Sequence, residues 1–141
     1  MEKYIHNVKY YETDKMGITH HSNYIRWMEE ARIDFFEQIG LSYSFLEAAG
    51  VFSPVISVEC SFQAPTTFGD DVEIEVKVEE FKGVKLILSY RMTKRGSGET
   101  VAAGRSEHCF VDKAGRLMIL KRMYPELDEK LKLIADETGN A

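Results

Sequence analysis

The chain lacks the features that mark secreted, membrane-spanning and disulfide-rich proteins. It has two cysteines, Cys60 and Cys109, which lie far apart inside apolar runs, so we expect buried thiols rather than a disulfide or a nucleophile. No segment approaches the roughly 20 apolar residues of a membrane span. The first residues also lack the apolar stretch of a signal peptide. The sequence therefore predicts a cytoplasmic protein with no membrane span.

A concentrated basic surface is absent as well. The net charge is −5, and acidic and basic residues are interspersed, which argues against binding of nucleic acid through its phosphate backbone. No linker, repeat or low-complexity segment divides the 141 residues. A chain of this length buries roughly two-thirds of the surface that its unfolded form exposes, so it folds without a metal or a disulfide. We expect residues 1–141 to form one domain.

The strongest pattern in the sequence is a helix that begins at His21 or Ser22 and ends before Gly40. Gly40 suits the left-handed conformation of a C-terminal cap. Apolar residues recur in between at spacings of three and four, in a stripe about half the circumference wide. These residues are Tyr24, Ile25, Trp27, Met28, Ala31, Phe35, Phe36 and Ile39. The rest of the chain must wrap a helix this apolar. A second, short helix is expected over residues 42–49.

From Val55 onward the apolar period changes from about 3.6 to 2, which indicates strands. Two alternating runs, 72–79 and 84–92, are joined by a short turn and predict a hairpin. The other elements expected are strands over residues 3–11, 99–111 and 117–120, and a last helix that begins at Pro125. Strands joined by short turns are antiparallel. The predicted fold class is therefore α+β, with one curved antiparallel sheet of about five strands around the long helix.

The polar loop before the long helix holds the first candidates for chemistry, Asp14 and Gly17. The first N–H groups of a helix have no partners within it, and the helix dipole makes that end electropositive. A carboxylate that faces such a helix start has the components for acyl transfer. The amides bind an oxyanion, and the carboxylate attacks a carbonyl or deprotonates water. The residues alone leave a second interpretation open, in which Asp14 and Gly17 only form a turn.

Other catalytic patterns are not found in the sequence. His20 and His21 are adjacent, and their spacing to other ligand types matches no metal motif, so we expect no metal. His108 lies in a predicted strand, and we expect it to be a hydrogen-bonded structural residue. The chain has no glycine-rich phosphate loop, serine elbow or Cys/His pair with a known spacing.

The segment from Tyr10 to Tyr24, YYETDKMGITHHSNY, resembles the catalytic segment of the 4-hydroxybenzoyl-CoA thioesterase family. It is most similar to the Tol–Pal-type acyl-CoA thioesterase branch, and the resemblance covers about residues 5–125. The resemblance implies a hot-dog fold, in which a curved antiparallel sheet wraps a long central helix. It also implies hydrolysis of acyl-CoA thioesters without a cofactor, by a homodimer or homotetramer whose active sites lie between subunits.

The same resemblance assigns roles to individual residues. Asp14 is implied to be the nucleophile or the general base, and the backbone N–H of His21 the oxyanion donor. Tyr10, Gly17 and the side chain of His21 are implied to complete the catalytic site. The residues implied in substrate binding are Tyr24 and the CoA-contacting hairpin residues Lys82, Gly83, Val84 and Lys85.

The same residues bear on alternative functions of this fold. A thioester of an acyl carrier protein is an alternative substrate, and a hot-dog protein that binds acyl groups without hydrolysing them is an alternative function. Asp14 and Gly17 argue against pure binding, because a binder has no need of a carboxylate at the helix start. The different Asp/His motif of hot-dog hydratases is not found in the sequence.

Overall fold

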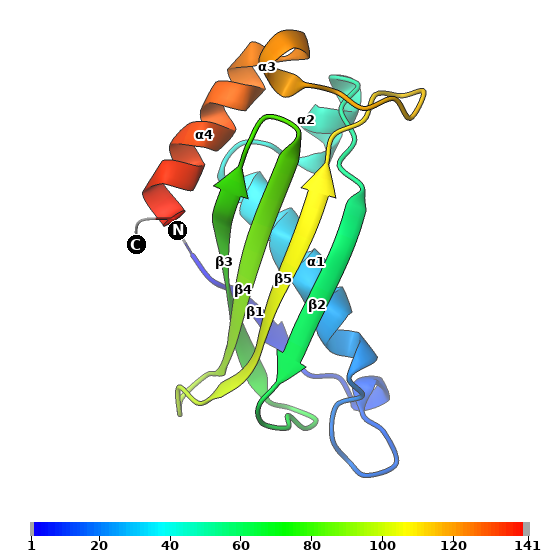
Figure 1. Ribbon diagram of the computed structural model, residues 1–141. Helices are drawn as coiled ribbons and strands as arrows, with labels where there is room; N and C mark the ends of the chain where they lie inside the picture. Colours follow the sequence, from blue (N-terminus) through cyan, green and yellow to red (C-terminus); the bar gives the residue numbers. More distant parts are fainter. Residues whose placement is uncertain (1, 140–141) are drawn as a thin grey trace.

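The computed structural model describes residues 2–139, which form a curved five-stranded antiparallel sheet around one long helix (Figure 1). The strand order is β1-β3-β4-β5-β2. The strands are β1 (Tyr4–Asn7), β2 (Val55–Phe62), β3 (Asp71–Phe81), β4 (Lys85–Lys94) and β5 (Thr100–Cys109). The helices are α1 (Ser22–Gln38), α2 (Tyr43–Ala48), α3 (Leu120–Met123) and α4 (Pro125–Gly139), with a 3-10 turn, η1 (Tyr10–Glu12). The predicted α+β class is confirmed.

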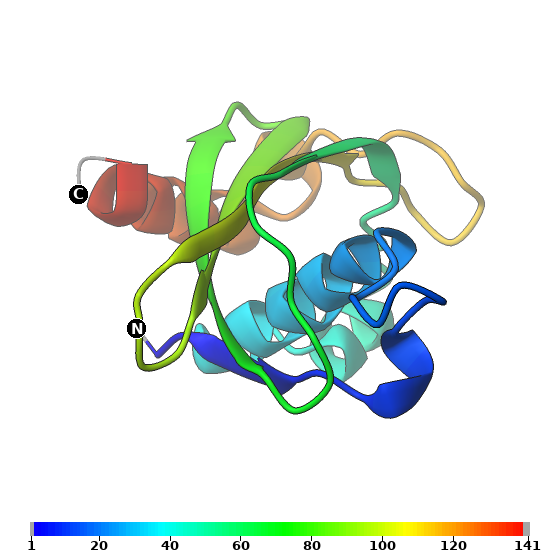
Figure 2. The same cartoon turned by 90° about the horizontal axis from the view of Figure 1, so that it is seen from below.

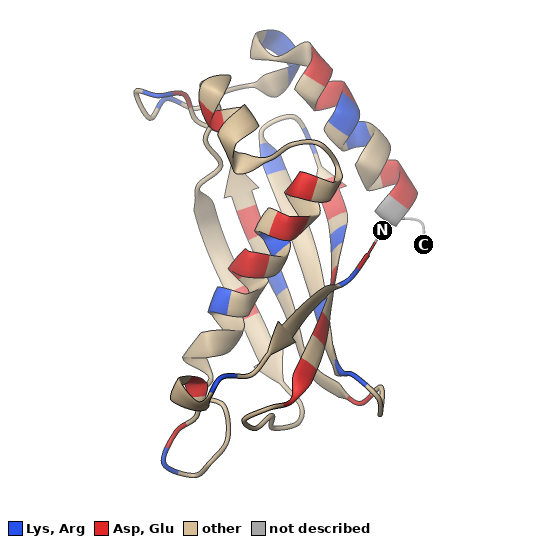
Figure 3. Ribbon diagram, turned by 180° about the vertical axis from the view of Figure 1, so that it is seen from behind, with Lys and Arg blue, Asp and Glu red and all other residues tan. Residues whose placement is uncertain are grey.

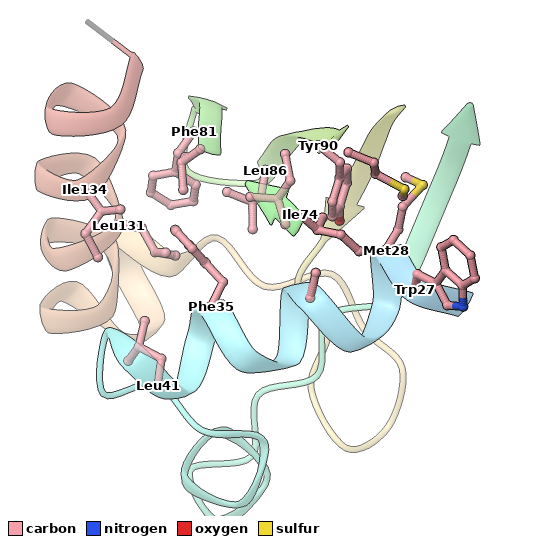
Figure 4. Close-up of a cluster of buried hydrophobic side chains, with 14 of the residues drawn as sticks. Trp27, Met28, Phe35, Leu41, Ile74, Phe81, Leu86, Tyr90, Leu131 and Ile134 are labelled. Atoms are coloured by element: carbon pink, nitrogen blue, oxygen red, sulfur yellow. The ribbon is translucent and has the colours of Figure 1, made fainter. Parts of the chain in front are cut away.

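Helix α1 is the centre of the core, as its apolar stripe predicts. Its side chains Tyr24, Trp27, Met28, Ala31 and Phe35 are all buried. Figure 2 shows the sheet curving over α1, with α4 alongside β3. In Figure 4 the buried residues of α1 lie against the inner face of the sheet, and Leu131 and Ile134 of α4 cover the end of the core near Phe35.

Glycines explain the end of α1 and its distance from the sheet. Gly40 ends the helix with a φ of +79°, the left-handed conformation that the sequence predicts. Gly104 of β5 lies against α1, where a Cβ atom would be 2.9 Å from the sulfur of Met28. The absence of a side chain at this position therefore lets the helix approach the sheet closely.

The predicted hairpin is confirmed, but two predicted strands are wrong in part. Strand β1 ends at Asn7, because residues 10–12 turn into η1, which the Glu12 side chain caps by accepting the N–H of Lys9 at 2.8 Å. Residues 117–120 form only an isolated bridge between Val111 and Leu117 before α3 begins. The alternation there reflects burial of Met118 and Leu120 as anchors of a loop.

Strand β2 forms one edge of the sheet. Within residues 2–139 it pairs only with β5, and all but one of its residues are exposed. Four of its apolar side chains are 42–56% exposed, namely Val55, Ile56, Val58 and Phe62. The sheet therefore presents an unpaired edge with apolar side chains on it.

Charged residues are spread over the molecule rather than gathered on one element. In Figure 3 the Lys and Arg positions alternate with Asp and Glu positions on α1, α4 and the strands. None of the helices within residues 2–139 is long and apolar enough to cross a membrane.

Candidate active site

The loop that carries Asp14 is a tight turn between η1 and α1. The N–H of Asp14 donates to the carbonyl of Ile18 at 2.8 Å, and the N–H of Gly17 donates back to the carbonyl of Asp14 at 3.0 Å. Gly17 has a φ of +80°, a conformation that favours glycine over any residue with a Cβ. The turn therefore depends on glycine at this position.

The segment that follows β2 holds this loop in place. Thr19 donates its N–H to the carbonyl of Thr66 at 2.8 Å, and the two hydroxyl groups are 2.6 Å apart. Thr67 donates its hydroxyl to the carbonyl of Gly17 at 2.9 Å. Because Thr19 and Thr66 are both buried, the loop is fixed to the core on this side.

The carboxylate of Asp14 is half engaged by its own loop. Oδ1 accepts the N–H of Met16 at 2.8 Å, whereas Oδ2 has no hydrogen-bond partner among the described residues. The side chain lines an open cavity of about 490 Å³ at the end of β2. The other residues that line it are Ile18, Thr19, His21, Tyr24, Phe62, Gln63, Ala64 and Pro65. One carboxylate oxygen is thus oriented and the other is free to react.

Helix α1 starts beside the same cavity. His21 already has helical angles (φ −56°, ψ −28°), and the next N–H groups are satisfied. Ser22 donates to Nδ1 of His20 at 3.2 Å, and Asn23 donates to the carbonyl of His20 at 3.0 Å. Tyr24 donates to the carbonyl of His21 at 3.2 Å. In this turn of the described chain, only the N–H of His21 meets no acceptor.

The side chains around this helix start form a compact aromatic and polar group. The rings of His20 and His21 stack with centroids 4.3 Å apart, and Nδ1 of His20 lies 2.8 Å from the hydroxyl of Ser22. Tyr24 is buried, which raises its pKa, and its hydroxyl lies 2.9 Å from that of Thr66. Tyr24 is therefore a neutral phenol that shapes the cavity. Residues 2–139 contain no group of three or more His, Cys, Asp or Glu side chains that could hold a metal ion.

Comparison with known families shows which superfamily the chain belongs to. The sequence model described as "Thioesterase-like superfamily" matches residues 8–137. The chain belongs to this superfamily.

Relatives and solved structures agree with this membership. The chain is 36% identical over 106 residues to "Putative acyl-CoA thioesterase YneP" of Bacillus subtilis, covering 75% of this chain and 76% of that one. It is 33% identical over 119 residues to "Putative esterase" of Aquifex aeolicus, covering 84% and 91%. The fold matches the crystal structure of "DHNA-CoA Thioesterase from Staphylococcus aureus" with a TM-score of 0.91 and 25% identity, over 99% of this chain and 93% of that one. The predicted family resemblance and hot-dog fold are confirmed.

Only some of the site residues that the family resemblance implies lie together in the structure. Asp14, His21 and Tyr24 line one cavity. Gly17 shapes the loop but does not line the cavity. Tyr10 is 75% exposed, and its ring packs edge-on against Phe68 at 5.7 Å. Tyr10 is not among the residues that line the cavity.

The predicted CoA-contacting residues lie elsewhere in the chain. Lys82, Gly83, Val84 and Lys85 form the β3–β4 turn, at the opposite end of the sheet from the loop of Asp14 (Figure 1). Lys82 pairs with Glu80 at 2.9 Å, and Lys85 pairs with Glu107 at 3.5 Å. Within one chain these lysines are therefore separate from the Asp14 cavity.

Sequence reasoning missed three residues that support the site. The threonines at 66 and 67, which hold the Asp14 loop, follow a strand with no pattern that marks them. Glu12 lies inside the segment that resembles the family, and it is buried two residues before Asp14. A buried carboxylate inside a polar loop has no local sequence signal, because its burial depends on β1 and α1.

Proposed function

We propose that the protein hydrolyses acyl-CoA thioesters to the free acid and CoA, with Asp14 as the reacting carboxylate. The observation that carries this proposal is that Asp14 and His21 line one cavity, and that Oδ2 of Asp14 and the N–H of His21 have no hydrogen-bond partner among the described residues. Membership of a thioesterase superfamily supports the reaction type. The printed names of the relatives, which refer to acyl-CoA and DHNA-CoA thioesterases, support CoA thioesters as substrates.

The proposed chemistry needs few groups. The thioester oxygen accepts the N–H of His21, which stabilises the negative charge that develops on it. Asp14 either attacks the carbonyl carbon, giving an anhydride that water then cleaves, or takes a proton from a water that attacks. In both routes the C–S bond breaks and the electron pair leaves with sulfur. A thiolate is a good leaving group, so no strong general acid is required.

The test is replacement of Asp14 by Asn, with release of free thiol measured on a panel of acyl-CoA thioesters. Asn keeps the size of the side chain and an oxygen for the N–H of Met16, but it loses the basic oxygen. We expect turnover to fall by several orders of magnitude, because groups that act as a unit fail together. Asp112→Asn is a matched control, because Oδ1 of Asp112 also accepts an N–H two residues on, from Ala114 at 2.9 Å.

Each outcome of this experiment decides something. Full activity of Asp14→Asn would remove Asp14 from the mechanism while leaving the thioesterase in place. Hydrolysis of acyl-carrier-protein thioesters alone would move the substrate to that class. Absence of hydrolysis by the unmodified protein on both classes would favour a protein that binds acyl groups without cleaving them.

We also propose that the site is completed in a homodimer, or in a homotetramer built from such dimers. The unpaired edge of β2 and its exposed apolar residues support pairing of β2 with a second copy. Val55 and Phe62 lie at opposite ends of β2, about 23 Å apart along the strand. Antiparallel pairing across a twofold axis would therefore place Val55 of one copy near Phe62 of the other. A second cavity of about 210 Å³, lined by Glu29, Arg32 and Val55 among others, would then adjoin the Asp14 cavity of the second copy. The β3–β4 turn with Lys82 would lie at the same end of the sheet as this second cavity, and so near the Asp14 cavity of the second copy.

The remaining parts of the proposal concern the whole chain. We propose that residues 1–141 act as one hot-dog domain in the cytoplasm, with no cofactor and no nucleic-acid partner. The free thiols of Cys60 and Cys109 fit a reducing compartment. Burial raises the pKa of the Cys60 thiol to about 11, so it is an inert structural thiol.

A further inference from the structure

Glu12 is a buried carboxylate on which donors from three segments converge. Its Oε1 accepts the N–H of Lys9 at 2.8 Å and lies 2.8 Å from Nε2 of His6, in β1. Its Oε2 accepts the indole N–H of Trp27, in α1, at 2.7 Å. Burial by itself raises the pKa of Glu12, but the hydrogen bonds from Lys9, Trp27 and His6 outweigh it and lower the pKa below 4.5. Glu12 is therefore an ionised group fixed on every side.

The partners of Glu12 are themselves fixed. His6 is 8% exposed, its ring lies 4.5 Å from that of Trp27, and its Nδ1 is 3.2 Å from a carboxylate oxygen of Glu30. The same oxygen of Glu30 accepts the hydroxyl of Tyr4 at 3.1 Å. Glu12 is thus attached to the central helix and to the first strand through groups that have little freedom to move.

The backbone of Glu12 reaches the helix start. Its carbonyl accepts the N–H of His20 at 2.8 Å and the side-chain amide of Asn23 at 2.9 Å. His20 precedes the residue with the free N–H, and Asp14 follows Glu12 by two positions. One residue therefore holds both the loop that carries the carboxylate and the turn that carries the amide.

We infer that Glu12 is a positioning residue that sets the distance between the Asp14 carboxylate and the N–H of His21. The inference rests on the proposed function of those two groups. Catalysis depends on their relative placement, since a displacement of about 1 Å in an active site costs about 100-fold in rate. Glu12 lines no part of the cavity and touches no substrate, so its effect passes through the loop and the helix start.

Glu12→Gln tests this inference. Three donors meet the carboxylate, and an amide offers one acceptor oxygen and one NH₂ group, so one donor must face another donor. We expect kcat on an acyl-CoA thioester to fall by about 10- to 100-fold, with KM changed less than about twofold. We also expect faster hydrogen exchange at the N–H of Asp14, which is bonded to Ile18 in the intact loop.

Asp128→Asn is the matched control for loss of a buried carboxylate. Asp128 is 4% exposed and pairs with Lys132 at 3.0 Å, on α4, away from the Asp14 loop (Figure 1). We expect Asp128→Asn to lower the melting temperature while kcat stays within about twofold of the unmodified protein. An equal fall of kcat in both variants would mean that Glu12 acts only through stability, and it would overturn the inference.

Asn23→Ala is a second variant that tests the same inference if Glu12→Gln does not fold. It removes one of the two hydrogen bonds to the Glu12 carbonyl from a partly exposed position. We expect a smaller fall in kcat, about 3- to 10-fold, again without a change in KM. Unchanged kcat and unchanged exchange at Asp14 in a folded variant would overturn the inference. The exchange measurement needs no activity, so it separates failure of this inference from failure of the proposed thioesterase reaction.

Discussion

At the scale of single residues, the cavity of Asp14 combines one side-chain group with one backbone group. The three N–H groups that follow His21 are used to close the first turn of α1, which leaves the N–H of His21 itself free. The imidazole of His21 stacks on His20 and is exposed to solvent. The two parts of this residue therefore have separate roles, which substitution can distinguish.

Replacing His21 by Pro removes the N–H that we assign to oxyanion binding. The φ of −56° at this position, which directly precedes the first residue of α1, is close to the value that a proline ring imposes, and the N–H lost there has no partner within the helix. We expect kcat to fall by about 100- to 1,000-fold. His21→Ala keeps the N–H and loses the ring, and we expect its loss to be at least tenfold smaller. Similar losses in the two variants would assign the effect to the imidazole.

At the scale of secondary structure, β2 combines an unpaired edge with a row of exposed apolar side chains. The ring of Phe62 packs against Tyr24, so the alternate residue Val58 shares the face that looks toward the helix. Val58 is 42% exposed, which is costly for a side chain in water unless a second copy covers it.

Val58→Asp is expected to separate the proposed dimer into monomers, because a carboxylate would be buried without a partner in the interface. The measurement is molar mass by light scattering, compared with the chain mass of 16.2 kDa. Leu133→Asp, at a residue of α4 that is 59% exposed, is the control and should leave the mass unchanged. Thiol release should fall together with the mass in the first variant. A monomeric unmodified protein with full activity would contradict this prediction.

The elements that the sequence predicts well are those with a strong internal period. The stripe of α1 and the alternation of β3 and β4 are properties of the local sequence, so their burial follows without knowledge of the rest of the chain. The strand expected over residues 117–120 fails because two buried residues, Met118 and Leu120, anchor a loop with the same spacing as a strand. Alternation measures burial, and a strand is only one of its causes.

The same limit applies to the candidate site. Asp14 and His21 belong to one local segment, so a sequence motif contains both. Thr66 and the Glu12 network depend on contacts between distant segments, such as the bond from Trp27 to Glu12, and no local pattern encodes them. The relation that we propose between the Lys82 turn and Asp14 is a contact between two copies, so no local pattern encodes it either.

At the scale of the whole molecule, a buried polar chain crosses the core on the side of β4 and β5. An Arg32 nitrogen lies 3.4 Å from the hydroxyl of Tyr90, which is 2.7 Å from the hydroxyl of Ser106, and that hydroxyl is 2.7 Å from Nε2 of His108. The structural, hydrogen-bonded role predicted for His108 is confirmed. Burial, and then the positive charge of Arg32, lower the pKa of His108 to about 4 from 6.5.

This shift makes stability depend on pH in a defined window. Because the folded state disfavours the protonated ring, the unfolded chain binds the proton first as the pH falls below 6.5. The contribution of the neutral His108 ring to the free energy of unfolding is fully present above pH 6.5. Up to about 3 kcal/mol of it is lost as the pH falls to about 4. We expect His108→Gln to flatten the unfolding free energy, measured in urea, between these pH values. An unchanged slope would contradict the assignment.

The close approach of Met28 to Gly104 bears on how the sequence can drift over evolution. Gly17 and Gly40 are constrained by their own positive φ angles, so a change in a neighbouring side chain does not relax the requirement for glycine there. Gly104 is constrained by the space that the end of the Met28 side chain fills, whereas its φ is not positive, so other residues can adopt its backbone conformation. A larger residue at position 104 is compatible with the helix only together with a smaller or differently placed one at position 28. The two positions should therefore covary among homologues, as one shared volume divided between a helix and a strand.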